Sequence, residues 1–189
     1  MKGRPPVRRM VRAWYREARG GSPFRAEMEA QGKRGTWDYE SETAHAPRVI
    51  RERLALEESG GELPDVMRTR YVFRADDQAV MLSTSYEPYA LTRGEPVVFP
   101  EDGPYAGVGV VDRMAVIGVE ITHCAEVVSA RPALAEEARQ LGLPAGGLVL
   151  TIERTYYADE RPVETTDMVI PVDRYQLVYG VPVRGASGE

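Results

Sequence analysis

Residues 148–157 read LVLTIERTYY and residues 161–171 read RPVETTDMVIP, and this stretch decides the fold. β-branched and aromatic side chains are frequent in both runs, as is typical of strands. Asp159-Glu160 between the runs has the composition of a tight hairpin turn. A helix over 132–141, which Pro132 opens and Gly142 closes, is expected just before the first run. The stretch therefore predicts a helix that leads into a long antiparallel pair of strands.

Outward from this hairpin, the sequence predicts further short elements that are joined by tight turns. Ser22 is suited to cap a helix that has Pro23 at its first position, and Gly32 is suited to end it. The other expected elements are a strand over 36–44, a helix from Pro47, strands over 66–74 and 79–86 with a turn at 76–78, a helix over 105–114, and strands over 116–128 and 177–183. This pattern predicts an α+β fold, with an antiparallel sheet flanked by helices.

The composition is that of an ordinary globular chain, with 43% hydrophobic and 28% charged residues. No apolar run is long enough to span a bilayer, and no signal-peptide pattern opens the chain, so no membrane partner is expected. The single cysteine, Cys124, cannot form an intrachain disulfide, which favours a cytoplasmic location. With one cysteine and two histidines no metal site is expected, and no motif calls for a cofactor.

The net charge of −5 is unevenly distributed along the chain. Residues 1–19 carry seven basic side chains and one acidic side chain, a net +6, which leaves −11 on the remainder. A basic segment of this kind can contact nucleic-acid phosphates, and it can equally be a solvated linker. We expect a basic arm over 1–21, one domain over 22–183 and a disordered tail over 184–189.

Motifs for catalysis are absent from the sequence: there is no nucleophile elbow, phosphate loop or dinucleotide fingerprint. Alternation over 116–128 places His123 on an apolar strand face and Cys124 on the opposite face, so the two cannot form a thiolate–imidazole pair. A core or pocket histidine is favoured over a catalytic base. The sequence therefore predicts a protein that is not an enzyme.

The closing hairpin carries charged residues in its interior. With a two-residue turn, Arg154 lies opposite Thr165 and diagonal to Asp167 on one face, close enough for an ion pair. For these two residues a structural ion pair is favoured over a ligand contact. Glu164 falls on the other face among apolar neighbours, where a carboxylate needs a hydrogen-bond donor. An internal arginine could supply that donor, and so could a ligand hydroxyl or amine.

Six blocks of the chain, in order and at matching spacing, resemble the UTRA domain, which is the effector-binding half of HutC-type GntR transcription regulators. The blocks are Ser22 to Met28 with Gly32, Ala46-Pro47 with Arg53-Leu54, Thr84 to Pro88, Ala130 to Pro144, Glu153 to Thr155 with Pro162 to Glu164, and Asp173 to Tyr175. Together they cover about 22–183. The resemblance implies a chorismate-lyase-like fold, in which helices flank a central antiparallel sheet.

The resemblance also implies partners and a ligand site. It implies a bacterial homodimer that senses a small-molecule effector and meets operator DNA only through a winged helix-turn-helix outside these 189 residues. We expect the ligand-binding residues to be Ser22, Phe24, Tyr71, Phe73, Ser83, His123, Arg154 and Glu164. Tyr71 and Ser83 pair across the predicted hairpin, and Glu164 is expected to supply the only charge of the pocket.

The chain departs from the family members that bind phosphorylated sugars. Those members place two arginines where this chain has Tyr71 and Phe73, and a glutamate where it has Ser83. Without the two arginines a phosphate dianion lacks its bidentate donors, whereas aromatic faces suit a flatter and more apolar ligand. Tyr71 and Phe73 could also be ordinary core residues.

Two other classes of function remain open. A lyase of the chorismate-lyase type would use the same fold, but it would need positive charge around a dicarboxylate substrate. Binding of DNA by the basic arm alone would be weak and would depend steeply on salt.

Overall fold

A six-stranded antiparallel sheet forms the centre of the protein in the computed structural model, which describes residues 7–10, 21–57 and 63–179. Its strand order is β2-β3-β4-β7-β6-β5. The strands are β2 (Gly35–Ala44), β3 (Val66–Ala75), β4 (Gln78–Pro88), β5 (His123–Pro132), β6 (Leu148–Ala158) and β7 (Arg161–Pro171). Each strand pairs antiparallel with its neighbours, so the predicted α+β class is confirmed.

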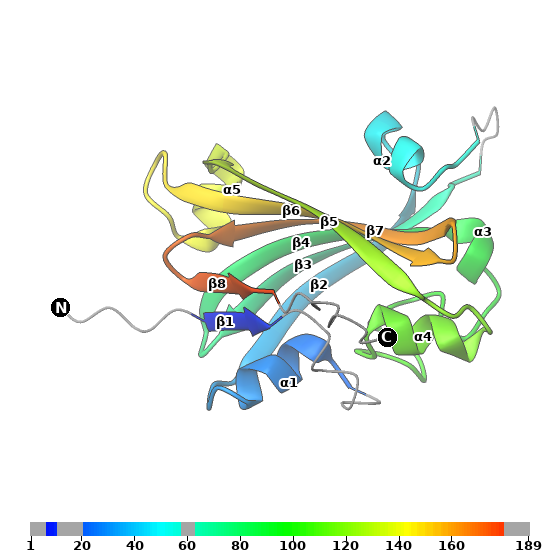
Figure 1. Cartoon of the computed structure of the whole chain (residues 1–189), viewed down its shortest axis with the longest axis horizontal. Coiled ribbons are helices and arrows are strands. Elements are labelled where there is room, and N and C mark those ends of the chain that lie inside the picture. Colours follow the sequence, from blue (N-terminus) through cyan, green and yellow to red (C-terminus); the bar gives the residue numbers. More distant parts are fainter. Residues whose placement is uncertain (1–6, 11–20, 58–62, 180–189) are drawn as a thin grey trace, which may run out of the picture.

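Short helices cover both faces of this sheet (Figure 1). Helices α1 (Pro23–Glu29) and α4 (Val110–Val116) lie on one face, and α2 (Arg48–Arg53) and α5 (Ala135–Leu141) lie on the other. A single turn, α3 (Tyr89–Thr92), follows β4. Among the described residues, no helix has both the length and the hydropathy to cross a membrane.

A second sheet of two strands brings together segments from the two ends of the chain. β1 (Val7–Met10) pairs in parallel with β8 (Tyr175–Val178). Figure 1 shows this pair on the same side of the main sheet as α1. β1 falls within the predicted arm, so this part of the arm is hydrogen-bonded to the domain, while the domain boundaries themselves stay predictions. The predicted strand over 177–183 begins two residues earlier, and residues 180–189 lie outside the described part of the chain.

Local sequence explains where several elements begin and end. The Ser22 hydroxyl accepts a backbone N–H from the first turn of α1 at 3.4 Å, and Pro23 opens the helix, as predicted. Asp76 and Asp77 have φ angles of 49° and 69°, the left-handed pair that a two-residue hairpin turn requires. Gln78, which was predicted to lie in the turn, pairs with the last residue of β3 instead.

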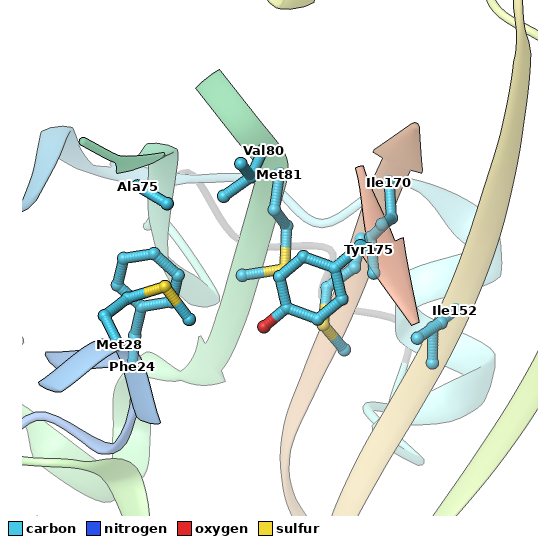
Figure 2. Packing of buried hydrophobic residues seen from close by; sticks show 9 residues of the cluster. Phe24, Met28, Ala75, Val80, Met81, Ile152, Ile170 and Tyr175 are labelled. Atoms are coloured by element: carbon cyan, nitrogen blue, oxygen red, sulfur yellow. The ribbon is translucent and has the colours of Figure 1, made fainter. Parts of the chain in front are cut away.

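The main hydrophobic core lies between α1 and the sheet (Figure 2). Phe24 and Met28 project from α1 towards strand residues, and Figure 2 shows the Tyr175 ring near the centre of the group. The buried members are Phe24, Met28, Ala75, Val80, Met81, Ile152, Met168, Ile170 and Tyr175. Burying one large apolar side chain contributes about 1.5–3 kcal/mol, so this cluster is a major source of stability.

Two predicted helices begin later than expected. The helix predicted over 105–114 is α4, which starts only after Gly109. Gly107 has a φ of +69°, so the residues before α4 form turns rather than helix. The helix predicted over 132–141 starts at Ala135, because β5 continues to Pro132.

The strand predicted over 116–128 is wrong in its first half. Gly118, with a φ of +74°, follows the end of α4. Val119 and Ile121 then pack in a hydrophobic cluster with α4, and only from His123 onward does the chain form β5. The alternation of apolar residues in this segment came from packing against a helix, not from a strand.

Two β-bulges decide which side chains face α1 and α4. Val80 is an extra residue in β4, and Val163 is an extra residue in β7 between Pro162 and Glu164. At a bulge two residues of one strand oppose a single residue of its partner, and the alternation of faces is interrupted. Val163 therefore joins the buried cluster beside α4, and Glu164 pairs with Tyr156.

The second bulge overturns the predicted register of the closing hairpin. The two-residue turn at 159–160 is confirmed, but Arg154 pairs with Thr166 rather than with Thr165. Arg154 and Glu164 consequently share one face of the sheet, whereas opposite faces had been predicted. The prediction counted residue pairs outward from the two-residue turn, as in a regular hairpin. Such a count leaves out the extra residue Val163.

The core assignment predicts the effect of truncating Ile170, which is 0% exposed. We expect Ile170→Ala to lower the free energy of unfolding by about 2–5 kcal/mol, because it leaves a cavity in a packed cluster. Val49→Ala, at a side chain of α2 that is 52% exposed, is the matched control and should cost at most about 0.5 kcal/mol. Urea denaturation measures both values, and equal losses in the two variants would contradict the assignment.

Candidate functional site

A cavity of about 520 Å³ lies between the sheet and the two helices α1 and α4. Its walls come from α1, from α4 and the loop before it, and from strands of the main sheet. All eight residues predicted from the sequence line this cavity: Ser22, Phe24, Tyr71, Phe73, Ser83, His123, Arg154 and Glu164. The structure thus brings the set together, while ligand binding by these residues stays a prediction.

Aromatic rings form one wall of the cavity. Tyr71 and Phe73 are stacked, with ring centroids 5.2 Å apart and an interplanar angle of 20°. The Phe24 ring centroid lies 4.8 Å from that of Phe73. The ring of Trp37, the partner of Phe73 on β2, lies 6.1 Å away on the same face. Tyr71 pairs with Ser83 as predicted, so a small polar residue lies directly beside the aromatic pair. This wall is suited to a ligand with a flat surface.

Glu164 is buried in the cavity wall and is held by hydroxyl groups. The Ser85 hydroxyl donates to Glu164 Oε1 at 2.7 Å, and the Thr166 hydroxyl donates to the same oxygen. Ser85 lies opposite Thr166 in the β4–β7 pair, so neighbouring strands supply the two donors. Hydroxyl donors compensate for part of the cost of removing a carboxylate from water.

Arg154 points into the same cavity and is paired with a carboxylate from β5. Its Nε donates to Glu126 Oε1 at 2.5 Å, and its guanidinium lies 5.6 Å from the centre of the Tyr156 ring. Burial lowers the pKa of Arg154, but Tyr156 and Glu126 together raise it above its usual value, so the side chain stays charged. The predicted ion pair with Asp167 is wrong, because Asp167 lies on the opposite face and bonds Arg53 at 2.7 Å.

A buried ion pair beside the cavity was not predicted from the sequence. Arg113 of α4 bonds Glu87 of β4 and the backbone carbonyl of Val97, and the two charged side chains are 1% and 2% exposed. Burial, with a smaller effect of Glu164, raises the pKa of Glu87 to about 7 despite Arg113. Within the described residues, Glu87 Oε2 has no hydrogen-bond partner.

The loop before α4 contributes a second unpredicted carboxylate. Glu101 Oε2 accepts the indole N–H of Trp37 at 2.9 Å, and the Tyr71 hydroxyl also donates to this carboxylate. The expectation that Glu164 is the only charge of the pocket is therefore wrong. Alternation along β4 could have placed Glu87 with Ser83, but no pattern in the sequence connects Glu101 to the cavity.

His123 lies at the exposed rim of the cavity, not on a buried apolar face. Its ring stacks on Tyr157 with centroids 4.8 Å apart and an interplanar angle of 6°. In the first half of β5 the half-buried side chains are those of Cys124 and Glu126, so the predicted assignment of faces around His123 is wrong. Ser22 caps the N-terminus of α1 and also lines the cavity.

The opposite face of the sheet carries a second, broader hollow of about 730 Å³. It lies beneath α2 and α5 and is lined by charged side chains that pair with one another, as Arg53 does with Asp167 and Arg131 with Glu137. These pairs engage charged side chains that could otherwise bind a ligand. The cavity beside α1 is therefore the stronger candidate for a binding site.

Known proteins share both the sequence pattern and the fold of this chain. The UTRA domain family matches residues 31–176. A solved structure assigned to the GntR family of transcriptional regulators has 48% sequence identity to the chain and a TM-score of 0.82, covering 96% of this chain and 75% of its own. None of the curated protein sequences matches.

Two more distant structures support the fold alone. PhnF from Mycobacterium smegmatis is 18% identical with a TM-score of 0.73, over 96% of this chain and 74% of its own. The C-terminal domain of Yurk from Bacillus subtilis is 19% identical with a TM-score of 0.62, over 75% of this chain and 92% of its own. The chain belongs to the UTRA domain family, the sensing domains of GntR-type transcription regulators.

The raised pKa of Glu87 predicts a pH dependence of stability. The folded protein binds this proton at pH values where the unfolded chain, with a pKa near 4.5, has released it. The free energy of unfolding should therefore fall as the pH rises from 4.5 towards about 7, by up to about 3 kcal/mol from this group. Urea denaturation across this range measures the slope.

Glu87→Gln should remove this part of the slope, because glutamine does not titrate. Glu160→Gln, at an exposed turn residue, is the matched control and should keep the slope of the wild type. A wild-type slope in Glu87→Gln would contradict the assignment of the raised pKa to Glu87.

Proposed function

We propose that the cavity between α1, α4 and the sheet binds a small-molecule effector that controls operator binding. One observation carries this proposal: an aromatic wall and buried polar groups converge on a cavity of about 520 Å³. Ligand pockets commonly enclose about 300–1,000 Å³ and combine apolar walls with a few oriented polar groups. Membership of the UTRA family supports the same function.

A hydrogen bond connects the cavity to the N-terminal strand, which supports a route for regulation. The Tyr175 hydroxyl donates to Glu27 Oε2 at 2.8 Å, and Glu27 lines the cavity from α1. Tyr175 is the first residue of β8 and lies opposite Val7 of β1. A ligand that binds one arrangement of this contact more tightly would shift the position of β1.

In this proposal the shift of β1 moves the DNA-binding parts of a HutC-type regulator. A winged helix-turn-helix outside this chain would contact the operator, so the basic arm does not read DNA by itself. Such regulation would place the protein in the bacterial cytoplasm.

We infer that the effector is not a phosphosugar. Tyr71, Phe73 and Ser83 supply no positive charge to the cavity. The two arginines of the described lining, Arg113 and Arg154, are both engaged with carboxylates. A phosphate dianion would have to break one of these buried pairs to find a cationic partner.

We also infer that the chain is not an enzyme. A chorismate-lyase-like enzyme would need cationic side chains around a dicarboxylate substrate, and carboxylates predominate in this cavity. Release of pyruvate from chorismate by the purified chain would contradict this inference.

A thermal-shift screen against metabolites tests the proposed site. A ligand at a hundredfold excess over its dissociation constant should stabilise the chain by about 2.7 kcal/mol. Ser83→Met should abolish the shift, because the longer side chain fills the cavity beside Tyr71. Thr84→Met is the matched control on the same strand, since Thr84 lines the hollow on the opposite face.

The two variants distinguish the faces of the sheet. We expect a wild-type shift in Thr84→Met and none in Ser83→Met. The reverse result would place the effector beneath α2 and α5 and would overturn the proposed site.

We further propose that the protein is a homodimer, as the family resemblance implies. The edge strand β5 and the segment around β8 expose apolar side chains, including Val127 and Tyr179, that a second copy could cover. Light scattering at micromolar concentration should give twice the chain mass of 21.0 kDa. A mass of one chain would contradict the proposal.

A further inference from the structure

Carboxylates outnumber guanidinium groups in the described lining of the cavity. Two arginines line it, Arg113 and Arg154, and each forms an ion pair with one of the carboxylates. The carboxylates are those of Glu27, Glu87, Glu101, Asp112, Glu126 and Glu164. Acidic side chains are thus the main charged groups that a ligand would meet in the described lining.

Glu101 is a carboxylate in direct contact with the aromatic wall. Its side chain is hydrogen-bonded to the Trp37 indole and the Tyr71 hydroxyl, both of which are neutral donors. Burial is the main effect on Glu101 and raises its pKa, which indicates a carboxylate that water does not fully solvate. A cationic group placed beside it would be stabilised more strongly than in water.

The backbone leaves space at this position. A Cβ at Gly107 would lie 3.5 Å from the Trp37 ring and 3.7 Å from Glu101 Oε2. Gly107 also lines the cavity, so the missing side chain keeps the approach to both groups open. Its φ of +69° further favours glycine at this position.

The aromatic wall can itself receive a cation. The guanidinium of Arg25 lies 5.1 Å from the centre of the Trp37 ring, which shows that this indole already takes part in a cation–π contact. Tyr71 and Phe73 extend the aromatic surface from Trp37 towards Ser83. A carboxylate beside several ring faces is the arrangement that recognises organic cations.

We propose that the effector carries a positively charged nitrogen on a flat apolar body, with Glu101 binding the charge and the aromatic wall binding the body. This inference rests on the proposed function, because it concerns the same cavity. A second acceptor is available to such a ligand, since Glu87 Oε2 has no hydrogen-bond partner in the described residues. An ammonium, amidinium or guanidinium group donates several N–H bonds and could use both carboxylates.

An anionic effector would meet the opposite situation. It would face the carboxylates of the lining, and both described arginines would have to leave their partners to reach it. Removing one partner from a buried ion pair strongly disfavours the remaining charge. The engagement of both described arginines therefore disfavours an anionic effector.

Three probes with one indole ring test this inference by titration calorimetry: tryptamine, tryptophol and indole-3-acetate. They carry an ammonium, a hydroxyl and a carboxylate on a short chain. We expect tryptamine to bind about tenfold more tightly than tryptophol, and indole-3-acetate to bind most weakly. Glu101→Gln should weaken tryptamine about tenfold and change tryptophol by less than about twofold, because glutamine keeps an acceptor for Trp37 but loses the charge.

Two further variants control the experiment. Glu95→Gln removes an exposed carboxylate that does not line the cavity, and it should leave the order of the three probes unchanged. Ser83→Met should block all three probes.

The possible outcomes separate this inference from the proposed function. Tighter binding of indole-3-acetate than of tryptamine, if Ser83→Met abolishes it, would overturn the cationic class and keep the cavity as the effector site. No binding of tryptamine at millimolar concentration, or equal binding by Glu101→Gln, would also overturn the inference. Binding that Ser83→Met leaves intact would overturn the proposed site itself.

Discussion

One extra residue in β7 determines which polar side chains of this strand face the cavity. Val163 is not matched in β6, so the strand that follows it is shifted by one position against its partner. Because side chains alternate between faces, this shift turns Glu164 and Thr166 towards the same side as Arg154. Without the bulge, Glu164 would face the layer of α2 and α5, and the cavity would lose its hydroxyl-bound carboxylate. The corresponding bulge at Val80 lets two consecutive residues of β4 join the core beneath α1.

The same side of the sheet therefore carries both the main core and a charged cavity. These two regions have opposite effects on the stability of the fold. The core gains stability from apolar burial, whereas the Glu87–Arg113 pair costs desolvation free energy that its mutual attraction only partly returns. Ser85 and Thr166 reduce such costs for Glu164 by donating hydroxyl hydrogen bonds to its carboxylate. Buried carboxylates of this kind are frequent at functional sites.

The position of the cavity also relates binding to the ends of the chain. α1 follows the N-terminal segment, β8 holds β1 by a parallel pairing, and the Tyr175–Glu27 hydrogen bond joins these parts to the cavity lining. The opposite face has no comparable connection among the described residues, since its arginines pair with carboxylates of neighbouring strands and helices. A ligand beside α1 thus lies where a small displacement can reach the N-terminal strand, whereas a ligand beneath α2 and α5 would first meet a network of surface charges.

The sequence by itself determined the α+β class, the capped start of α1 and the closing turn at 159–160, because these features depend on local propensity. Tyr71 pairs with Ser83 as predicted, but the prediction placed Gln78 in the turn, and the bulge at Val80 offsets that error. The eight residues that were predicted from the sequence to bind a ligand also line one cavity. The tertiary structure alone decided the positions of the bulges, the faces of Arg154 and His123, and the ionic partners of Arg154 and Asp167. It alone brought Glu101, Arg113 and Glu126 to the cavity. These depend on contacts between segments that are far apart in the chain, where packing against a helix or a single inserted residue outweighs the local pattern.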